Sequence, residues 1–272
     1  MQPTVKSLKL GSRVYFGAYS VREGAIPSPI SWLKATPNGD FVSEFVLDSL
    51  AFDAKEAYMD RPNLFNQGNP NYKLSNLHQF LNSDEPEWFR PTHDLDRPPA
   101  VGSTGWRNGA YSDHSGFLTH FESHELDSIV EQEFVMSGDH ITAKMRILSG
   151  DDLWSQTKFK LFNKKGIRAQ ASDDFLWNKA TGDTMYVPYW ICDRAVTTYS
   201  RYLGAGANVH TTGACNSSGI RPTCMLSLDT MVEQFDDDSW RILSSGVAPR
   251  PASLVEFASR DEIIQFLGLA QP

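Results

Sequence analysis

The residues best suited to chemistry in this sequence lie between positions 189 and 217, and their types favour binding. Aromatic and polar side chains are mixed there with Gly and Ser. Such mixtures are typical of recognition loops, because rings stack on sugar faces while Arg and Asn hydrogen-bond to hydroxyl groups. The segment therefore predicts a ligand-binding face in a flexible polar loop. Its candidate residues are Trp190, Arg194, Tyr199, Arg201, Tyr202, Asn208, His210 and Asn216.

Burial of the first aromatic residues in this segment is the competing interpretation. Tyr189 and Trp190 have apolar neighbours and fit a core position equally well, which would leave only the following loop exposed. Tyr199 and Tyr202 have polar neighbours, so we expect them to form a solvent-facing patch together with Arg201.

Residue spacings typical of enzymes are missing from the sequence. It contains no G-x-S-x-G elbow, no H-E-x-x-H helix and no P-loop. His120 and His124 are four residues apart and could share a metal ion on a helix, but no glutamate lies between them to act as a base. An exposed polar helix face is the preferred interpretation of this pair. We therefore expect no enzymatic activity, no metal and no other cofactor.

Composition and charge exclude several classes of protein. The 272 residues include 40% apolar and 21% charged residues, so wholesale disorder is excluded. The formal net charge of −8, with dispersed basic residues, argues against nucleic acid and anionic membrane surfaces as partners. No apolar run approaches the ~20 residues that span a bilayer, and the first residues lack the apolar core of a signal peptide. We expect a chain that folds in a cytoplasm, without membrane insertion.

Alternating apolar and polar residues predict that a largely antiparallel sheet positions these residues. Asn38-Gly39 is a hairpin signal within this pattern. Strands are expected over residues 10–19, 30–35, 41–50, 140–148, 185–192 and 220–231.

Two helices and two long loops complete the predicted elements. Ser75 is suited to cap a short helix that ends at Asn82. The segment Phe117–Ile129 predicts a second helix, because Phe117, Phe121, Glu125 and Ile129 recur every four positions. Gly, Pro and small polar residues predict loops over 83–116 and 194–219.

The end of the sequence has the character of an appendage. We expect one domain over residues 1–235 and a C-terminal extension over 236–272. Ser259 and Glu262 have the spacing of a capping box, for a helix of only about two to three turns that would be marginal alone. Its apolar residues must pack against a protein surface, and the prolines upstream favour an extended chain that could reach away from the domain. The extension is therefore predicted to be an assembly arm that docks onto a neighbouring subunit.

Several blocks, in order, resemble one family of bacterial and prophage domains of unassigned function with a C-type-lectin-like architecture. The resemblance covers roughly residues 8–230. Cys192 and Asp193 depart from the pattern, because arginine and serine are usual at these two positions. The matching residues are Phe16-Gly-Ala-Tyr19, Ile30-Ser-Trp32, Ser75, Leu77, Phe80, Leu81, Asn82, Phe117, Phe121, Glu125, Ile129, Leu148-Ser149, Tyr189-Trp190-Ile191 and Gly219-Ile220-Arg221-Pro222.

The resemblance implies an α+β, C-type-lectin-like fold with a twisted, mostly antiparallel sheet, two helices and long ordered loops. It also implies a non-enzymatic phage or prophage virion surface protein, at a tail tip, a fibre or the head, that binds host surface glycans or a receptor. Its partners would be other virion subunits in a homo-oligomer, and its location the virion after folding in the host cytoplasm. The alternatives are a purely structural virion protein without a ligand, and a location in the bacterial cytoplasm.

The resemblance also marks positions with structural roles. Pro222 would open a late strand without removing a ladder hydrogen bond. Arg221 is expected to be buried, since a fixed guanidinium group can satisfy several loop carbonyls at once. The structural positions are Trp32, Asn82, Gly219, Arg221 and Pro222.

The three cysteines leave a remote alternative open. Their odd number and the lack of a C-x-x-C pair favour buried thiols in a reducing compartment. Formylglycine-generating enzymes, however, share the lectin-like architecture and bind copper through two late cysteines, and thiolates suit Cu(I). Cys215 and Cys224 are late and nine positions apart, but that enzyme's closely spaced pair is not reproduced. A copper-dependent oxidase is therefore the remote alternative.

Overall fold

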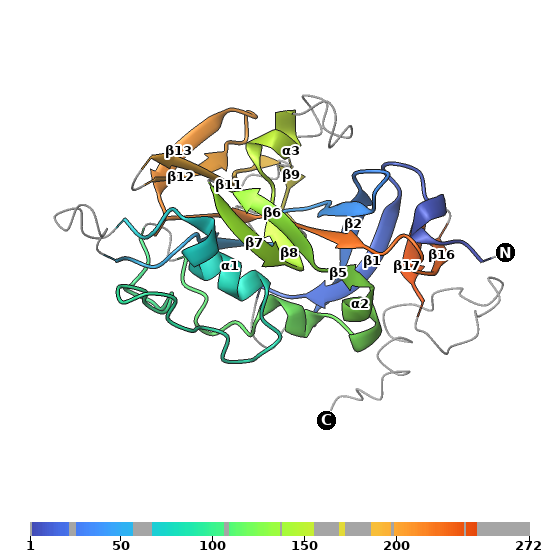
Figure 1. Cartoon of the computed structure of the whole chain (residues 1–272), viewed down its shortest axis with the longest axis horizontal. Helices are drawn as coiled ribbons and strands as arrows, with labels where there is room; N and C mark the ends of the chain where they lie inside the picture. Colours follow the sequence, from blue (N-terminus) through green and yellow to red (C-terminus); the bar gives the residue numbers. More distant parts are fainter. Residues whose placement is uncertain are drawn as a thin grey trace.

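Two β-sheets account for most of the regular structure (Figure 1). The computed structural model describes residues 2–21, 26–56, 67–105, 109–136, 138–154, 169–171, 186–196, 199–236 and 238–243. Within these ranges the α-helices have at most six residues, so the fold is α+β with a large excess of sheet. The helices are η1 (Val5–Ser7), η2 (Tyr72–Leu74), α1 (Asn76–Leu81), η3 (Phe117–His120), α2 (Ser123–Ser128) and α3 (Gly150–Trp154).

The larger sheet has eight strands in the order β16-β17-β1-β2-β3-β15-β5, and β8 also pairs with β15. Its pairs are antiparallel except β1 with β17, which confirms a mostly antiparallel sheet. Its strands are β1 (Arg13–Tyr19), β2 (Ser28–Lys34), β3 (Asp40–Ser43), β5 (Ile129–Val130), β8 (Met145–Ile147), β15 (Pro222–Leu226), β16 (Val232–Asp236) and β17 (Ser239–Ile242).

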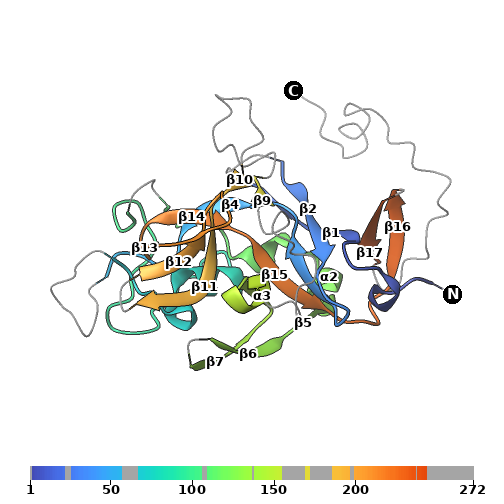
Figure 2. The ribbon, with the colours of Figure 1, turned by 90° about the horizontal axis from the view of Figure 1, so that it is seen from above.

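The smaller sheet has five strands in the order β13-β12-β11-β14-β4. Figure 2 shows this sheet at one end of the molecule and the β16–β17 hairpin at the other. Its strands are β4 (Asp48–Ala51), β11 (Tyr189–Val196), β12 (Tyr199–Leu203), β13 (Val209–Gly213) and β14 (Ser217–Ile220). Two further pairs are β6 (Gln132–Met136) with β7 (Asp139–Ala143), and β9 (Ala169–Gln170) with β10 (Tyr186–Val187).

The chain passes between the two sheets at two points that lie side by side. The strand expected over 41–50 is two strands, because β3 ends in the larger sheet and β4 begins in the smaller one. The chain returns at Arg221, which is 2% exposed, so its predicted burial is confirmed. Its Nε donates a hydrogen bond to the Ser43 carbonyl (3.0 Å), and its guanidinium carbon lies 5.4 Å from the centre of the Tyr189 ring. One side chain therefore ties both crossing points together.

The helix expected over Phe117–Ile129 is broken into η3 and α2. Phe121 is extended, with φ −119° and ψ 143°, and Glu122 begins a new capping box with Glu125. Glu125 Oε1 also accepts a hydrogen bond from the backbone N–H of Gly17 in β1 (3.0 Å). The four-residue spacing suggested one continuous helix, but capping and this tertiary bond divide it. The other predicted helix is confirmed as α1, with the Ser75 hydroxyl accepting from the His78 N–H.

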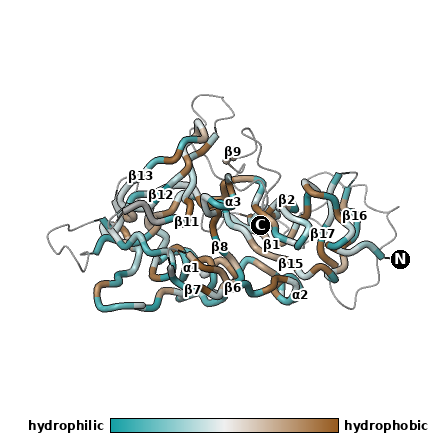
Figure 3. Tube along the Cα trace, turned by 45° about the horizontal axis from the view of Figure 1, so that its top comes forward, coloured by the Kyte–Doolittle hydropathy of each residue, from teal (hydrophilic) through white to brown (hydrophobic). Residues whose placement is uncertain are grey.

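The core is rich in aromatic residues, and hydrophobic and hydrophilic stretches are interspersed along the chain (Figure 3). Trp32 is fully buried, stacks on Phe16 with ring centres 4.8 Å apart, and donates its Nε1 hydrogen to the Phe16 carbonyl (2.9 Å). Asn82 joins α1 to β8: its Nδ2 donates to the Met145 carbonyl and its Oδ1 accepts from the Met145 N–H, both at 2.9 Å. Both side chains therefore join separate elements of the fold.

Gly219 and Pro222 occupy constrained positions on either side of the return crossing. A Cβ at Gly219 would lie 2.4 Å from Val46 Cγ1 and 2.6 Å from the Pro188 carbonyl oxygen, so no larger residue fits without movement. Pro222 is buried and is the first residue of β15, in agreement with its expected role.

The expected domain boundary after residue 235 falls inside the β16–β17 hairpin. Ser239–Ile242 forms β17, which pairs in parallel with β1 and antiparallel with β16. This part of the expected extension therefore belongs to the main sheet. Residues 244–272, which carry the predicted assembly arm, lie outside the described part of the chain.

Candidate functional site

The segment predicted to be a flexible binding loop is a β-meander. β11 pairs antiparallel with β12, and β12 pairs antiparallel with β13 through five consecutive residue pairs. The turn at 204–208 is closed by hydrogen bonds from Ala207 N–H to the Gly204 carbonyl (2.9 Å) and from Gly204 N–H to the Asn208 carbonyl (2.8 Å). The expectation of a loop was wrong, because Gly and polar residues also build the turns and exposed strands of a meander.

Strand geometry divides the predicted binding residues between two faces. Successive side chains of a strand point to opposite faces, so Tyr199 and Arg201 lie on one face of β12 and Tyr202 on the other. Tyr199 is 40% exposed, whereas Tyr202 packs against the core. The single patch of Tyr199, Arg201 and Tyr202 that we expected is therefore wrong.

Three aromatic side chains form a row across neighbouring strands, which we call the aromatic row: Trp190, Tyr202 and His210. Trp190 and Tyr202 are opposite each other in β11 and β12, as are Tyr202 and His210 in β12 and β13. The Tyr202 ring meets Trp190 edge to face (centres 6.2 Å apart, 87°) and stacks on His210 (5.3 Å, 23°). Trp190 is fully buried and donates to the Leu50 carbonyl (2.8 Å), whereas His210 is exposed.

This arrangement corrects the role expected for Trp190. A fully buried indole whose N–H is already bonded cannot contact a ligand, so Trp190 is core and the interpretation of burial holds for it. Trp190 instead supports Tyr202, which in turn supports His210 at the surface. The row therefore presents a ring to solvent from a rigid base.

Polar residues surround the exposed end of the aromatic row. Thr212 lies on the same face of β13 as His210, and the Asn216 Nδ2 donates to its hydroxyl (2.7 Å). Asn208 is exposed in the turn that precedes His210. Arg194 lies in β11, but its side chain is outside the described structure.

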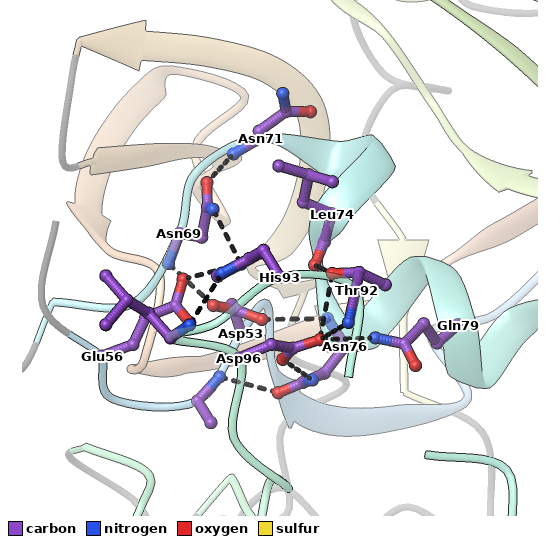
Figure 4. Close-up of polar contacts among 12 residues, drawn as sticks. Asp53, Glu56, Asn69, Asn71, Leu74, Asn76, Gln79, Thr92, His93 and Asp96 are labelled. Carbon is purple, nitrogen blue, oxygen red and sulfur yellow. Dashed lines mark hydrogen bonds and ion pairs between the residues drawn. The ribbon is translucent and has the colours of Figure 1, made fainter. Parts of the chain in front are cut away.

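Acidic side chains form a hydrogen-bonded group beside α1 (Figure 4). We call Asp53, Glu56, His93 and Asp96 the acidic cluster; the first two are 1% and 5% exposed. Glu56 Oε1 lies 3.4 Å from His93 Nε2. Asp53 follows β4 and Asp96 belongs to the long loop after α1, so residues far apart in sequence meet here.

The carboxylates of the acidic cluster organise backbone turns. Asp53 accepts the backbone N–H groups of Asn69 (2.7 Å) and Asn76 (3.0 Å). Asp96 accepts four hydrogen bonds, from the Thr92 N–H and hydroxyl and from the side-chain amides of Asn76 and Gln79. Asp53 and Asp96 therefore hold together the turn before η2, the start of α1 and the long loop.

Burial also changes the acidity of the cluster. It raises the pKa of Glu56 to about 7, and the charge of Asp96 adds to this shift. Burial and the charge of Glu56 raise the pKa of Asp53 well above its usual range. The Tyr111 hydroxyl is buried without a hydrogen-bond partner among the described residues, and the charges of Asp53 and Asp96 add to the burial that raises its pKa. The cluster therefore retains protons near neutral pH.

Backbone hydrogen bonds connect the acidic cluster to the meander. The Asp53 N–H donates to the Ala214 carbonyl (3.0 Å), in the turn that follows β13. In the same turn the Cys215 N–H donates to the Gln67 carbonyl (2.9 Å), and the Cys215 carbonyl accepts from Gly105 (2.6 Å). The loops organised by the cluster therefore fix the end of β13 next to the aromatic row.

The acidic cluster was not predicted, because Asp and Asn residues at this density favour the interpretation of ordinary turns. That interpretation was correct locally, because Asn69 and Asn71 do make turns with their own backbone neighbours. Nothing in the local sequence indicates that Asp53 is buried. The nearest indication in the sequence is that many Asp and Asn residues lie near a long loop, which needs hydrogen bonds of its own to be ordered.

The histidines and cysteines considered from the sequence lie on separate elements of the structure. In the described part of the chain, no three His, Cys, Asp or Glu side chains are arranged to hold a metal ion. Cys224 lies in β15 and Cys215 in the turn before β14, and burial raises the pKa of both thiols. The break at Phe121 leaves His120 and His124 on different helices, so the geometry of one helix face does not apply to them.

Comparison of the chain with protein-family models, curated proteins and solved structures gives no match. Among the described residues, no helix is both long and apolar enough to cross a membrane.

Proposed function

We propose that this chain is a non-enzymatic binding protein on the surface of a bacteriophage or prophage virion, with a C-type-lectin-like arrangement. It would sit at a tail tip, a fibre or the head, together with other virion subunits. Its ligand would be a glycan or receptor on the host surface, contacted by the face of β12 and β13 that carries His210.

The main support is the aromatic row. A ring exposed at the end of a buried stack is rigid before any ligand arrives, so little conformational entropy is lost on binding. Sugar rings present flat faces of C–H groups that pack on aromatic side chains, and their hydroxyl groups need amide and hydroxyl partners nearby. Thr212, Asn208 and Asn216 supply such groups around His210.

The acidic cluster adds support through the loops that border this face. It holds turns by side-chain hydrogen bonds and is joined to the turn after β13. A binding face needs loops in one fixed arrangement, and this cluster provides it without contacting the proposed ligand.

Binding of the full chain to a glycan array and to host cells tests the proposal. His210→Ala should weaken the binding of a wild-type ligand by up to about tenfold, because it removes the exposed ring. Tyr199→Ala is the matched control, since it removes an exposed ring from the opposite face of β12. The melting temperature of both variants should stay near that of the wild type.

Two results would contradict this assignment. If the wild-type chain binds no glycan and no host surface, the purely structural virion protein becomes the better assignment. If His210→Ala and Tyr199→Ala lose binding equally, the His210 face of β12 and β13 is not the binding face. Metal analysis of the purified chain tests the copper oxidase, for which stoichiometric copper would be required.

A further inference from the structure

A cleft of about 450 Å³ runs along one edge of β6. β6 pairs with β7 alone among the described strands, and Figure 2 shows the pair at the outside of the molecule. All five residues of β6 line the cleft, and β7 contributes none of the described residues that line it. The far wall comes from the turn before β3, from α3 and from β11. The cleft therefore borders the edge of β6 that faces away from β7.

The register of the hairpin shows which backbone groups of β6 point into this cleft. A two-residue turn joins β6 to β7, and Gly138 in it has φ 91°, so Met136 with Asp139 is the bonded pair that closes the hairpin. Bonded and non-bonded pairs alternate along an antiparallel ladder. Glu133 and Val135 therefore direct their N–H and carbonyl groups away from β7. Both residues are exposed, and no hydrogen bond from another part of the described chain reaches these groups.

The described lining of the cleft has an excess of negative charge. It holds five carboxylates and one arginine, Arg146, which is paired with Asp152 through hydrogen bonds of 2.5 and 3.2 Å. Burial, to which the charges of Asp151 and Asp152 add, raises the pKa of Asp193 on the far wall. Positive charge on a ligand would be complementary to this wall. The carboxylates are Asp40, Glu133, Asp151, Asp152 and Asp193.

Apolar side chains lie beside these charges. Val135 is 60% exposed at the edge, and Pro37 and Met136 also line the cleft. The Phe134 ring centre lies 5.8 Å from the guanidinium carbon of Arg146. A small hydrated cation would meet the charge but would leave the apolar surface and the outward backbone groups of β6 unused. The occupant that fits all three features is a peptide in extended conformation.

We propose that β6 binds, as an added strand, an extended segment of a different protein in which basic and apolar residues alternate. The backbone of the segment would bond to the outward groups of Glu133 and Val135, as in other cases of strand addition. Successive side chains of a strand point to opposite faces, so its basic residues can all face the carboxylates. This chain has a formal net charge of −8, which makes a different, basic chain the complementary partner. The site uses other elements than the His210 face and is independent of the proposed glycan.

The first test measures, by calorimetry, the binding of a six-residue peptide that alternates lysine and valine to the full chain. It should bind at least about tenfold more tightly than a peptide with glutamate in place of lysine, and more weakly as salt is added. Glu133→Gln combined with Asp151→Asn should weaken binding of the lysine peptide about tenfold.

A matched control removes the same two charges elsewhere. Asp84→Asn combined with Glu87→Gln neutralises two exposed carboxylates of the long loop, which do not line the cleft, and should bind like the wild type. A lysine peptide that does not bind the wild type overturns the proposal. Equal losses in the two double variants overturn it as well, because they would mean that only the overall charge matters.

Hydrogen exchange locates the peptide at the edge of β6 without any substitution. With saturating lysine peptide, the amides of Glu133 and Val135 should exchange at least about tenfold more slowly. Thr142, opposite Glu133 in the hairpin, directs its N–H to the other edge of the pair and should be unchanged. Binding without protection of the two β6 amides would mean that charge alone holds the peptide, and strand addition would be wrong.

A basic stretch of the chain itself is the competing occupant. It follows α3 in the sequence and contains Lys158, Lys160, Lys164, Lys165 and Arg168. Lys158→Gln combined with Lys160→Gln removes two of its charges. If the partner is a different protein, this variant should bind the lysine peptide like the wild type. An affinity at least about tenfold higher in the variant would show that the chain's own stretch competes for the cleft, and would overturn the assignment of the partner.

Discussion

The long loop over residues 83–116 and the meander over residues 189–213 share a composition rich in Gly and small polar residues, but they adopt different structures. In the described part of the first segment, no β-strand forms. The second forms three paired strands. Proline distinguishes them: the loop contains Pro86, Pro91, Pro98 and Pro99, whereas β12 and β13 contain none. Proline cannot donate to a sheet ladder, while Gly and Thr can.

The two segments are also held together by different interactions. The loop relies on side chains that bond to its backbone, such as Asp96 with Thr92 and the Trp88 indole with the His114 carbonyl (2.9 Å). The meander relies on backbone pairing and on the packing of Tyr202. The loop should therefore be sensitive to the loss of one polar group, and the meander to the loss of one ring.

The largest expected effect is in the loop. Asp96→Ala removes the acceptor of four hydrogen bonds and should lower the free energy of unfolding by about 2–4 kcal/mol. Urea denaturation measures this change. Asp94→Ala, an exposed carboxylate two residues away, should stay within about 0.5 kcal/mol of the wild type. Equal losses in both variants would show that the loop does not depend on Asp96.

In the meander, Tyr202→Ala should lower the free energy of unfolding by about 1–3 kcal/mol, because the ring packs between Trp190 and His210. Tyr199→Ala should change it by less than about 0.5 kcal/mol, since that ring is 40% exposed on the other face. Thermal and urea denaturation of the two single variants provide the comparison. A larger loss from Tyr199 would mean that the register of β12 is shifted by one residue.

The acidic cluster should make the stability of the folded chain depend on pH. The pKa of Glu56 is raised from 4.5 in its ordinary state to about 7, so the folded chain binds this proton more tightly than the unfolded chain. The stabilisation that protonated Glu56 gives the folded chain is complete below pH ~4.5 and is lost as the pH rises through about 7. The Glu56→Gln variant keeps the shape of the side chain but cannot become charged.

Denaturation measured from pH 5 to pH 8 tests this effect. Relative to the wild type, Glu56→Gln should gain about 1–2 kcal/mol of stability between these two pH values. Glu85→Gln, whose side chain is 60% exposed, is the control and should parallel the wild type. Parallel curves for all three chains would mean that Glu56 titrates as an ordinary exposed carboxylate.

The smallest expected effect is at the tip of the meander. Ala207 has φ 62°, a left-handed conformation that glycine adopts without steric cost. Ala207→Gly should raise the free energy of unfolding by up to about 1 kcal/mol. Ala205→Gly in the same turn should lower it slightly, because Ala205 does not have a positive φ. Calorimetry should show opposite shifts in melting temperature, and shifts of the same sign would contradict the turn described here.

Local sequence was sufficient for elements defined by a few neighbouring residues. The cap at Ser75, the short helix α1, the presence of strands β1 and β2 and the start of β15 at Pro222 all follow from propensity, capping and periodicity. The burial of Arg221 was also predicted correctly, from the position that the resemblance marks and the hydrogen-bonding capacity of a guanidinium group.

Only the tertiary structure decided which residues share a face or a site. The sequence over 41–50 could not show that the chain changes sheets after Ser43, because the change depends on the distant strands with which each half pairs. Trp190 is core because its indole reaches Leu50, 140 positions away, and Asp53 is buried because Asn69 and Asn76 satisfy its carboxylate. Capping and periodicity act within about one helical turn or strand, whereas burial depends on distant partners. The sequence alone therefore determined most of the strands and caps, and tertiary packing determined the faces and the acidic cluster.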